Sequence, residues 1–455
     1  MNTLITVSLL GIAAMLSEVF RFKKFIQTVF IAAVTGATGL AVLDWGTSYS
    51  YFRFMVLFDD YALAFSILFL VLTLIWLLLS QEYFCNENTR ADYFALISFS
   101  LAGAIILSSF SDLSMFFIGI EILSVSAYVL AGSNRSDIRS AEAALKYFLP
   151  GAFSTGFLLF GMALIYGATG SFNLSNISQW IIANHSNLPV MVNAGVVFLI
   201  TGLLFKIAAM PFHNWAPDVY DGSPTPVTAY MSTIIKAASF AAFYRLFVSC
   251  FSIMADWWTP LLVIAAAITM IGGNITAVYQ NNLKRMLAYS SIAHSGYLLL
   301  AVAAINQLSK PAMLFYLAAY SVASLGMFTL VNRMGNEQQL DKLKGFAHDN
   351  PFYAALITLL TLSMAGIPPL AGFFGKYYVF LSSIRSDLIW PVIVAVIASL
   401  IGVYYYFRIV YNMYSKPAAS AHVVSLSGFD KSAILITALL TLLLGIAPAL
   451  IADII

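Results

Sequence analysis

Long apolar runs recur from one end of the chain to the other, separated by short polar stretches. A membrane-crossing helix needs about 20 predominantly apolar residues, because the hydrocarbon core of a bilayer is about 30 Å thick. By that criterion the sequence predicts an all-α membrane protein with about fourteen spans. They lie near residues 2–20, 25–43, 61–80, 92–109, 112–131, 143–168, 193–212, 225–248, 258–279, 286–305, 311–332, 352–382, 390–414 and 432–453.

Breaks are expected in two of these spans, the seventh and the twelfth, where prolines follow or divide the apolar run. Pro211 lies near the end of 193–212, and a Gly-Ile-Pro-Pro run at 366–369 divides 352–382, which is too long for one straight crossing. Proline removes a helical hydrogen bond, and broken helices are tolerated in a membrane only where the freed backbone faces protein or water. The pattern therefore predicts half-helices at both places.

Composition supports the membrane interpretation. Of 455 residues, 61% are hydrophobic and only 9% are charged, whereas a soluble domain has about 25% charged residues. No soluble domain large enough for a nucleotide fold or a metal cluster is expected. Cys85 and Cys250 stand apart with no histidine nearby, which is typical of packing residues rather than redox centres. The N-terminal run has no leading positive charge, so we interpret it as a retained span rather than a signal peptide.

The basic residues indicate an orientation. If the N-terminus is outside, the predicted cytoplasmic loops hold most of the 22 lysines and arginines, and the external loops hold only Arg53, Lys310 and Arg385. Cytoplasmic loops of membrane proteins are enriched in lysine and arginine. The sequence therefore predicts that both termini lie on the outer face.

Weak internal similarity suggests two related halves. Tyr128 and Tyr147 recur 169 residues later as Tyr297 and Tyr316, each in a similar local run. A shift of five spans also pairs the two broken spans and reverses the direction of each helix, which describes an inverted repeat. The expected regions are 1–90 with three helices, 91–250 and 251–416 as the two repeats (helices 4–8 and 9–13), and 417–455 with the last helix.

Few ionisable side chains fall deep within the predicted spans. They are Glu121, Lys206, Lys236 and Lys376, with His294 as a titratable neighbour. An ionised residue at mid-membrane costs about 2.5–3.5 kcal/mol, so it is rarely kept without a partner or a task. Glu121 is the single deep carboxylate, which makes it the natural counter-ion for Lys206. Two interpretations follow: a proton path that uses this pair, and a static ion pair between helices.

The two histidines have alternatives of their own. His213 follows Lys206 by seven residues and would share its face on an unbroken helix, but with Pro211 between them it can instead cap freed carbonyls. His294 titrates near physiological pH, and Ser290, 291 and 295 around it can hold water. Metal binding fits His294 poorly, because no second histidine, cysteine or acid stands at ligand spacing.

Lys146 lies one turn after Glu142 near a predicted cytoplasmic end. We interpret the two first as a solvated i,i+4 contact. The alternative is that Lys146 takes part in proton entry.

Three long runs resemble a known family. FKIAAMPFHNWAPDVYDGSPTPVTAYMSTIIKAASF, NLKRMLAYSSIAHSGYLLLA and LSMAGIPPLAGFFGKYYVF resemble the antiporter-like membrane subunits of bacterial proton-pumping NADH:quinone oxidoreductase (respiratory complex I). The similarity extends from about residue 90 to 415, and PDVYDGSPTPVTAYMSTIIKAA is more similar to the N subunits than to L or M.

The resemblance implies a proton-translocating subunit of this translocase, with no redox chemistry of its own. In the family, the acid at Glu121 pairs with the lysine at Lys206, the lysine at Lys236 is central, and that at Lys376 lies toward the exit. The positions of Lys146 and His213 are further relay candidates.

The same resemblance implies cofactors, partners and a location. NADH, FMN, iron–sulfur clusters and quinone are expected in partner subunits and none on this chain. The expected neighbours are the antiporter-like subunits M and L, the small subunits J and K, and membrane lipids, without nucleic acid. The expected location is the bacterial inner membrane, with both termini on the periplasmic face.

Three alternatives share these features. A sodium/proton antiporter subunit would need clustered oxygen ligands for sodium, and Glu121 is the lone deep carboxylate. A sister complex that uses ferredoxin or formate as electron donor is a second alternative. A structural membrane arm is a third, and it predicts that neutralising Lys236 and Lys376 disturbs assembly rather than proton flux.

Overall fold

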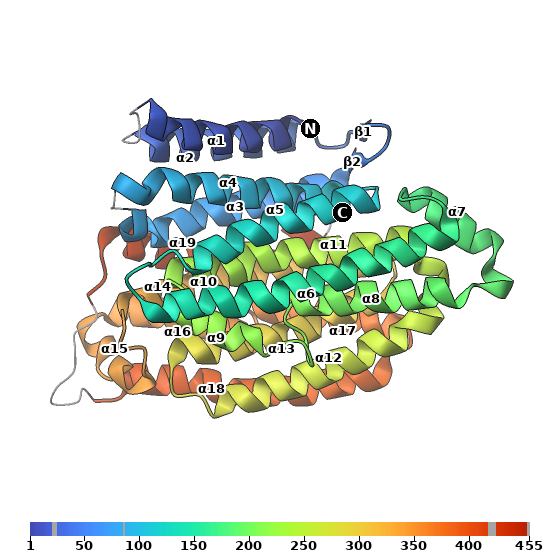
Figure 1. Cartoon of the computed structure of the whole chain (residues 1–455). Helices are drawn as coiled ribbons and strands as arrows, with labels where there is room; N and C mark the ends of the chain where they lie inside the picture. Colours follow the sequence, from blue (N-terminus) through green and yellow to red (C-terminus); the bar gives the residue numbers. More distant parts are fainter. Residues whose placement is uncertain (21–24, 85–86, 417–424, 453–455) are drawn as a thin grey trace. The chain divides into compact units, whose positions relative to one another are not determined.

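A computed structural model describes residues 1–20, 25–84, 87–416 and 425–452 of the chain. These residues are almost entirely helical, as predicted (Figure 1). The exception is a small antiparallel hairpin of β1 (Tyr49–Tyr51) and β2 (Val56–Phe58), in which Tyr49 pairs with Phe58. Cys85, which we interpreted as a packing residue, lies outside the described residues, whereas Cys250 is buried and free.

The chain forms two compact units, and the first comprises residues 1–74, 82–208 and 234–258. Its helices include α1 (Asn2–Val19), α2 (Ile26–Leu43), most of α3 (Asp60–Leu79), α4 (Glu87–Ser109), α5 (Leu113–Ala131), α6 (Ile138–Thr169), α7 (Leu174–Ala183), α8 (Val190–Lys206) and α11 (Lys236–Cys250). Within this unit, α6 packs along α8 and α4 packs along α5 (Figure 1).

The second unit comprises residues 75–81, 209–233 and 259–455. Its helices include α9 (Trp215–Gly222), α10 (Thr225–Tyr230), most of α12 (Ala255–Val278), α13 (Leu283–Ala304), α14 (Ser309–Arg333), α15 (Phe346–Asp349), α16 (Pro351–Ala365), α17 (Ala371–Arg385), α18 (Ile389–Tyr414), α19 (Gly428–Ile446) and α20 (Ala449–Ala452). Residues 209–233 group with this unit, although we placed them in the first sequence repeat. The inverted repeat stays a prediction.

The membrane character of the fold is confirmed for the part of the chain that the structure describes. Eleven helices there are long and apolar enough to cross a bilayer. Three shorter apolar helical stretches, Asn2–Ser17, Val190–Lys206 and Pro351–Ala365, lie at the predicted first, seventh and twelfth spans. The chain is therefore a multi-pass helical membrane protein, and the count of fourteen stays a prediction.

Both predicted helix breaks are present. In the first, α8 ends at Lys206 and α9 begins at Trp215; in the second, α16 ends at Ala365 and α17 begins at Ala371. Residue 366 is a glycine with φ of 89°, a left-handed conformation that ends helices and that other residues adopt at a cost.

Side-chain caps fix the start of two helices that carry candidate residues. Asp112 accepts a hydrogen bond from the Ser114 amide at the start of α5 (2.8 Å), and Asn282 accepts one from the Arg285 amide at the start of α13 (3.0 Å). Such caps satisfy amides that have no partner within the helix. They set where Glu121 and His294 lie along their helices.

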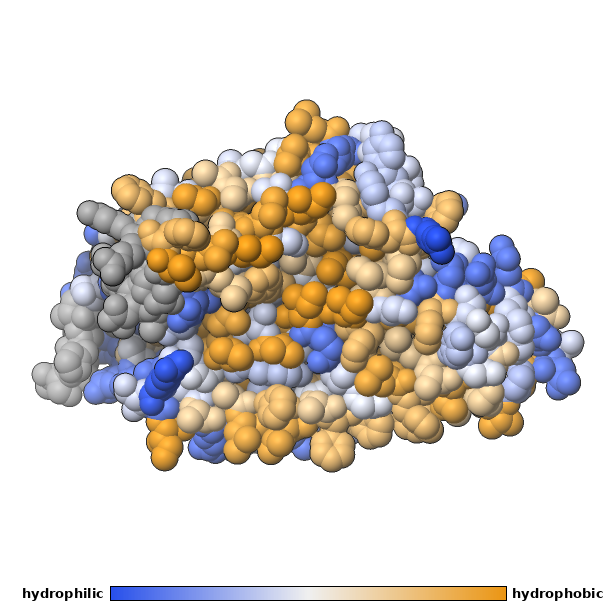
Figure 2. Space-filling model, turned by 45° about the horizontal axis from the view of Figure 1, so that its top comes forward, coloured by the Kyte–Doolittle hydropathy of each residue, from blue (hydrophilic) through white to orange (hydrophobic). Residues whose placement is uncertain are grey.

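The helices differ strongly in exposure. The apolar stretch of α14 is 100% buried and that of α13 is 94% buried, whereas those of α6 and α18 are only 39% buried. Large apolar side chains such as Phe153 on α6 and Leu400 on α18 point outward, and Figure 2 shows apolar side chains over much of the face it draws. Exposed apolar surface of this extent is typical of contact with lipid or another membrane chain.

Candidate functional site

The first candidate site surrounds Lys206, the last residue of α8. Its Nζ donates to Ser124 Oγ (2.8 Å) and Tyr128 Oη (3.3 Å) on α5, and it lies 5.7 Å from the centre of the Tyr128 ring. The last carbonyls of a helix lack intrahelical partners, and the helix dipole favours a cation at this end. The helix break therefore places Lys206 where a positive charge is stabilised without direct contact with a carboxylate.

Glu121 lies on the same face of α5 but binds elsewhere. Its Oε1 accepts a hydrogen bond from Thr155 Oγ1 on α6 (2.8 Å). Glu121 and Lys206 both lie within the described residues. Their side chains form no hydrogen bonds there other than those to Thr155, Ser124 and Tyr128. The two side chains form no direct contact in the structure, and the role of Glu121 as counter-ion of Lys206 stays a prediction. The carboxylate still acts on Lys206 electrostatically at longer range.

Lys236 occupies an unusual backbone position in the first unit. It is the first residue of α11 and directly follows a π-helical turn, Met231–Ile235, and only 3% of its surface is exposed. Single π-helical turns occur frequently at functional sites. Hydrophobic periodicity gives no signal for a π-helical turn, so this turn could not be predicted from the sequence.

His294 is buried in the second unit, with both ring nitrogens bonded. Nδ1 lies 2.7 Å from Tyr316 Oη on α14, and Nε2 lies 3.1 Å from Tyr406 Oη on α18. A neutral imidazole has one donor and one acceptor nitrogen. The two phenols therefore complete the hydrogen bonds of the neutral ring, and no charged partner is needed. A small cavity lies beside the ring. The centre of a water molecule can occupy about 10 Å³ of it, which is room for about one water.

Lys376 lies at the second helix break. Its Nζ donates to the carbonyl of Ala365, the last residue of α16 (2.8 Å), and to Ser399 Oγ on α18 (2.9 Å). It also lies 5.2 Å from the centre of the Tyr297 ring, which contacts the ring of His294. A Cβ at Gly366 would come within 3.0 Å of Lys376 Nζ. The break thus supplies both a free carbonyl and the space for the lysine.

The two secondary candidates differ from these buried groups. Lys146 Nζ lies 2.7 Å from Glu142 Oε1 and the side chains are 45% and 57% exposed, so the solvated i,i+4 contact is present. His213 lies in the turn between α8 and α9, so the helical alignment with Lys206 expected of an unbroken helix does not occur. Its Nδ1 has no hydrogen-bond partner among the residues that the structure describes.

Basic residues at the start of α13 contact the acidic helix α9. Arg285 lies 2.8 Å from Asp218, and Lys284 Nζ donates to the carbonyls of Asp221 (3.2 Å) and Ser223 (2.5 Å). Lys284 lies between the predicted spans 258–279 and 286–305, yet only 2% of it is exposed. Its acceptors are backbone carbonyls, which every residue has, so these contacts could not be predicted from the sequence.

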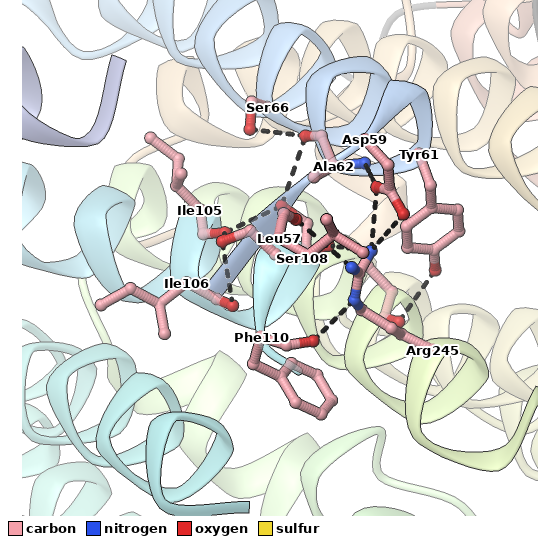
Figure 3. Close-up of polar contacts among 12 residues, drawn as sticks. Leu57, Asp59, Tyr61, Ala62, Ser66, Ile105, Ile106, Ser108, Phe110 and Arg245 are labelled. Carbon is pink, nitrogen blue, oxygen red and sulfur yellow. Dashed lines mark hydrogen bonds and ion pairs between the residues drawn. The ribbon is translucent and has the colours of Figure 1, made fainter. Parts of the chain in front are cut away.

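Arg245 on α11 is a buried cation to which the sequence analysis gave no role (Figure 3). Its guanidinium donates to both Asp59 oxygens (3.0 and 3.2 Å) and to the carbonyls of Phe110 (2.7 Å), Ser108 (3.0 Å) and Leu57 (3.3 Å). These acceptors belong to β2, the end of α4 and the chain just before α3. Arg245 therefore fastens four segments of the first unit together.

Metal-ligating side chains do not gather in the described parts of the chain. No group of three or more histidines, cysteines or acids is close enough there to hold an ion. The polar groups around the buried lysines and His294 are hydroxyls, phenols and carbonyls, which suit proton transfer through hydrogen bonds.

Comparisons with known proteins show the family to which the chain belongs. A family model described as "NADH:quinone oxidoreductase/Mrp antiporter, TM" matches residues 111–402. The NADH-quinone oxidoreductase subunit N of Cytophaga hutchinsonii is 39% identical over 453 residues, which is 98% of each chain. That of Trichlorobacter lovleyi is 41% identical over 421 residues, or 91% of this chain and 86% of the relative.

Solved structures show the same fold. A chain of respiratory complex I from Thermus thermophilus, solved with bound aureothin, has a TM-score of 0.84 and 30% identity, covering 99% of this chain and 98% of its own. A chain of the Mrp complex from Dietzia sp. DQ12-45-1b has a TM-score of 0.89 at 21% identity, covering 99% of this chain and 95% of its own, and is similar in fold. The chain therefore belongs to the NADH:quinone oxidoreductase/Mrp antiporter family of transmembrane proteins.

Proposed function

We propose that this chain is the proton-translocating membrane subunit N of an NADH:quinone oxidoreductase in a bacterial inner membrane. It works as one subunit of an H⁺-transporting translocase and has no redox centre of its own. The observation that carries the proposal is the setting of Lys206 and Lys376. Each lies at a helix break and donates to hydroxyls or a carbonyl. Such neutral partners let a lysine exchange its proton, whereas a bonded carboxylate holds it charged.

The proposed relay has a part in each unit. In the first unit, Glu121 and Lys206 lie near one end of the relay and Lys236 follows the π-helical turn. In the second unit, His294 and Lys376 both contact the Tyr297 ring. Within each unit water joins these groups, and Lys146 and His213 are secondary members.

Coupling would begin outside this chain. Quinone reduction in a partner subunit changes the field at Glu121, Lys206 passes its proton toward Lys236, and Lys376 releases one outward. Moving a unit charge against 100 mV takes about 2.3 kcal/mol. That is similar to a change of about two pKa units at 1.36 kcal/mol each, so a change in the field at one buried group is large enough to drive the step.

The partners follow from the same proposal. The antiporter-like subunits M and L and the small subunits J and K adjoin this chain, and NADH, FMN, iron–sulfur clusters and quinone bind elsewhere in the complex. Both termini lie on the periplasmic face, so the start of α13, with Lys284 and Arg285, lies on the cytoplasmic side.

Replacing Lys206 by alanine in the assembled complex tests the proposal. Inverted membrane vesicles allow NADH-driven quinone reduction and proton uptake to be recorded together, after native electrophoresis has verified assembly. We expect fewer protons per electron in Lys206→Ala. A matched control is Arg139→Ala, whose side chain is 56% exposed. Wild-type stoichiometry in an intact Lys206→Ala complex contradicts the proposal.

The likeness in fold to the Mrp complex chain makes a subunit of a sodium/proton antiporter the second candidate. Proton movement would then depend on sodium and not on quinone reduction. Adding sodium to vesicles that already hold an NADH-driven pH gradient distinguishes the two. An unchanged gradient supports the oxidoreductase, and a collapse of the gradient that Lys206→Ala abolishes supports the antiporter.

A further inference from the structure

The inward side of α18 carries hydroxyl groups, although the helix is largely apolar and much of it faces outward. Ser399 and Tyr406 are seven residues apart and therefore lie on the same face. Their neighbours Leu400, Tyr404 and Phe407 are 68%, 58% and 48% exposed, whereas Tyr406 is 1% exposed. The face that turns inward thus carries the hydroxyls, and Ser399 already contacts Lys376.

The Tyr406 hydroxyl joins two groups of α13. It lies 3.1 Å from His294 Nε2 and is hydrogen-bonded to Ser290 Oγ. Ser290 precedes His294 by one helical turn, on the side of the helix start where Lys284 and Arg285 lie. The phenol therefore connects the histidine with a hydroxyl that lies one turn closer to the basic start of α13.

The opposite ring nitrogen continues the series. His294 Nδ1 lies 2.7 Å from Tyr316 Oη, and Tyr316 and His294 both line the cavity that fits one water. The order Ser290, Tyr406, His294, Tyr316 is thus an unbroken series of hydrogen-bonded groups from three helices of the second unit.

We propose that Tyr406 is a proton-relay residue that delivers protons to His294 from the side of Ser290. This inference rests on the proposed proton translocation and assigns the route into its second half. In the step, the Ser290 hydroxyl gives its proton to the Tyr406 oxygen while Tyr406 gives its own to His294 Nε2. His294 then releases its Nδ1 proton to Tyr316, which passes its own to water in the cavity. A proton supplied from the start of α13 replaces that of Ser290, and a turn of the imidazole ring returns a proton to Nδ1. Every group then regains its starting state and none changes oxidation state.

Removing single hydroxyls tests the relay in the assembled complex. Tyr406→Phe keeps the ring and Ser290→Ala keeps the helix, but each interrupts the series. Loss of a positioned proton donor slows a transfer by about 100-fold. In inverted vesicles we therefore expect fewer protons per electron from both variants while the complex stays intact. Tyr404→Phe, the same change on the exposed face of α18, should leave the ratio unchanged.

A conservative variant separates relay from packing. Ser290→Thr keeps the hydroxyl, so it should pump better than Ser290→Ala, a difference that a purely structural role does not produce. If Tyr406→Phe fails to assemble, the comparison of Ser290→Thr with Ser290→Ala tests the relay. Normal pumping by Tyr406→Phe and Ser290→Ala beside a deficient Lys206→Ala overturns the relay and leaves the proposed function standing. Normal pumping by all three overturns the proposed function itself.

Discussion

Arg245 and Lys206 are both cations within the first unit, but their surroundings differ. Arg245 has a carboxylate and three backbone carbonyls around it and is 6% exposed. Lys206 has two hydroxyls, the second at 3.3 Å. A guanidinium stays protonated in proteins, and a carboxylate holds it further in place. Arg245 is therefore a fixed charge that joins segments, whereas Lys206 can lose or regain a proton without leaving a bonded anion behind.

The position of a cation deep within an apolar span therefore does not by itself identify a transport residue. Both side chains stand within apolar runs of the sequence. What separates them is the number and kind of acceptors, and these come from segments distant in the chain. The predictions below test that distinction from the largest expected effect to the smallest.

Removing the charge of Arg245 should have the largest effect, and on stability. Arg245→Met leaves Asp59 and three carbonyls without their donor. Losing one partner of a buried pair costs 3–5 kcal/mol, and because Asp59 is about one third exposed we expect about 3 kcal/mol. Thermal unfolding in detergent and the yield of assembled complex measure it. The complexes that do assemble should pump with the wild-type ratio, and a lowered ratio would show that Arg245 belongs to the relay.

Replacing Lys206 by arginine is the sharpest functional test of the comparison. Lys206→Arg keeps a positive charge but not a group that releases its proton. We expect proton transfer at this site to fall by about 100-fold with little change in assembly. Proton uptake and quinone reduction in the same vesicles measure it. Normal pumping in this variant would mean that Lys206 acts only as a fixed charge, like Arg245.

The sequence could predict the fold and the positions of the helix breaks. Apolar runs set the spans, and Pro211 and the Gly-Ile-Pro-Pro run at 366–369 set the breaks. Burial of Lys236 and Lys376 followed from the same pattern. These features depend on composition and on local backbone chemistry, which are readable along the chain.

The partners of these residues could not be predicted in the same way. Ser124 is 82 residues from Lys206, and Tyr406 is 112 residues from His294, so both contacts depend on how helices pack. Serine and tyrosine are common throughout the chain and give no signal of their own. Charge pairing predicts Glu121 as the counter-ion of Lys206, but it gave no sign that two hydroxyls of the same helix face would bind the amine.

Removing the hydroxyls around Lys206 should have an intermediate effect. Ser124→Ala and Tyr128→Phe each delete one acceptor, and a hydrogen bond to a charged group contributes about 1.5–3 kcal/mol. Without them the amine loses its neutral ligands, and we expect a several-fold slower proton uptake with assembly intact. The double variant should approach the defect of Lys206→Ala. Normal uptake in the double variant would show that other groups, such as water, support the lysine.

The smallest effect is expected at the exposed pair of Lys146 and Glu142. Glu142→Gln removes a contact between side chains that are 45% and 57% exposed, and such i,i+4 pairs contribute about 0.3–0.5 kcal/mol. Stability and pumping should therefore stay close to wild type in thermal unfolding and vesicle assays. Here the ion pair is direct and yet of little consequence, whereas Lys206 has no direct pair and is expected to matter most for transport. A strong pumping defect in Glu142→Gln would reverse that order and make Lys146 a principal member of the relay rather than a secondary one.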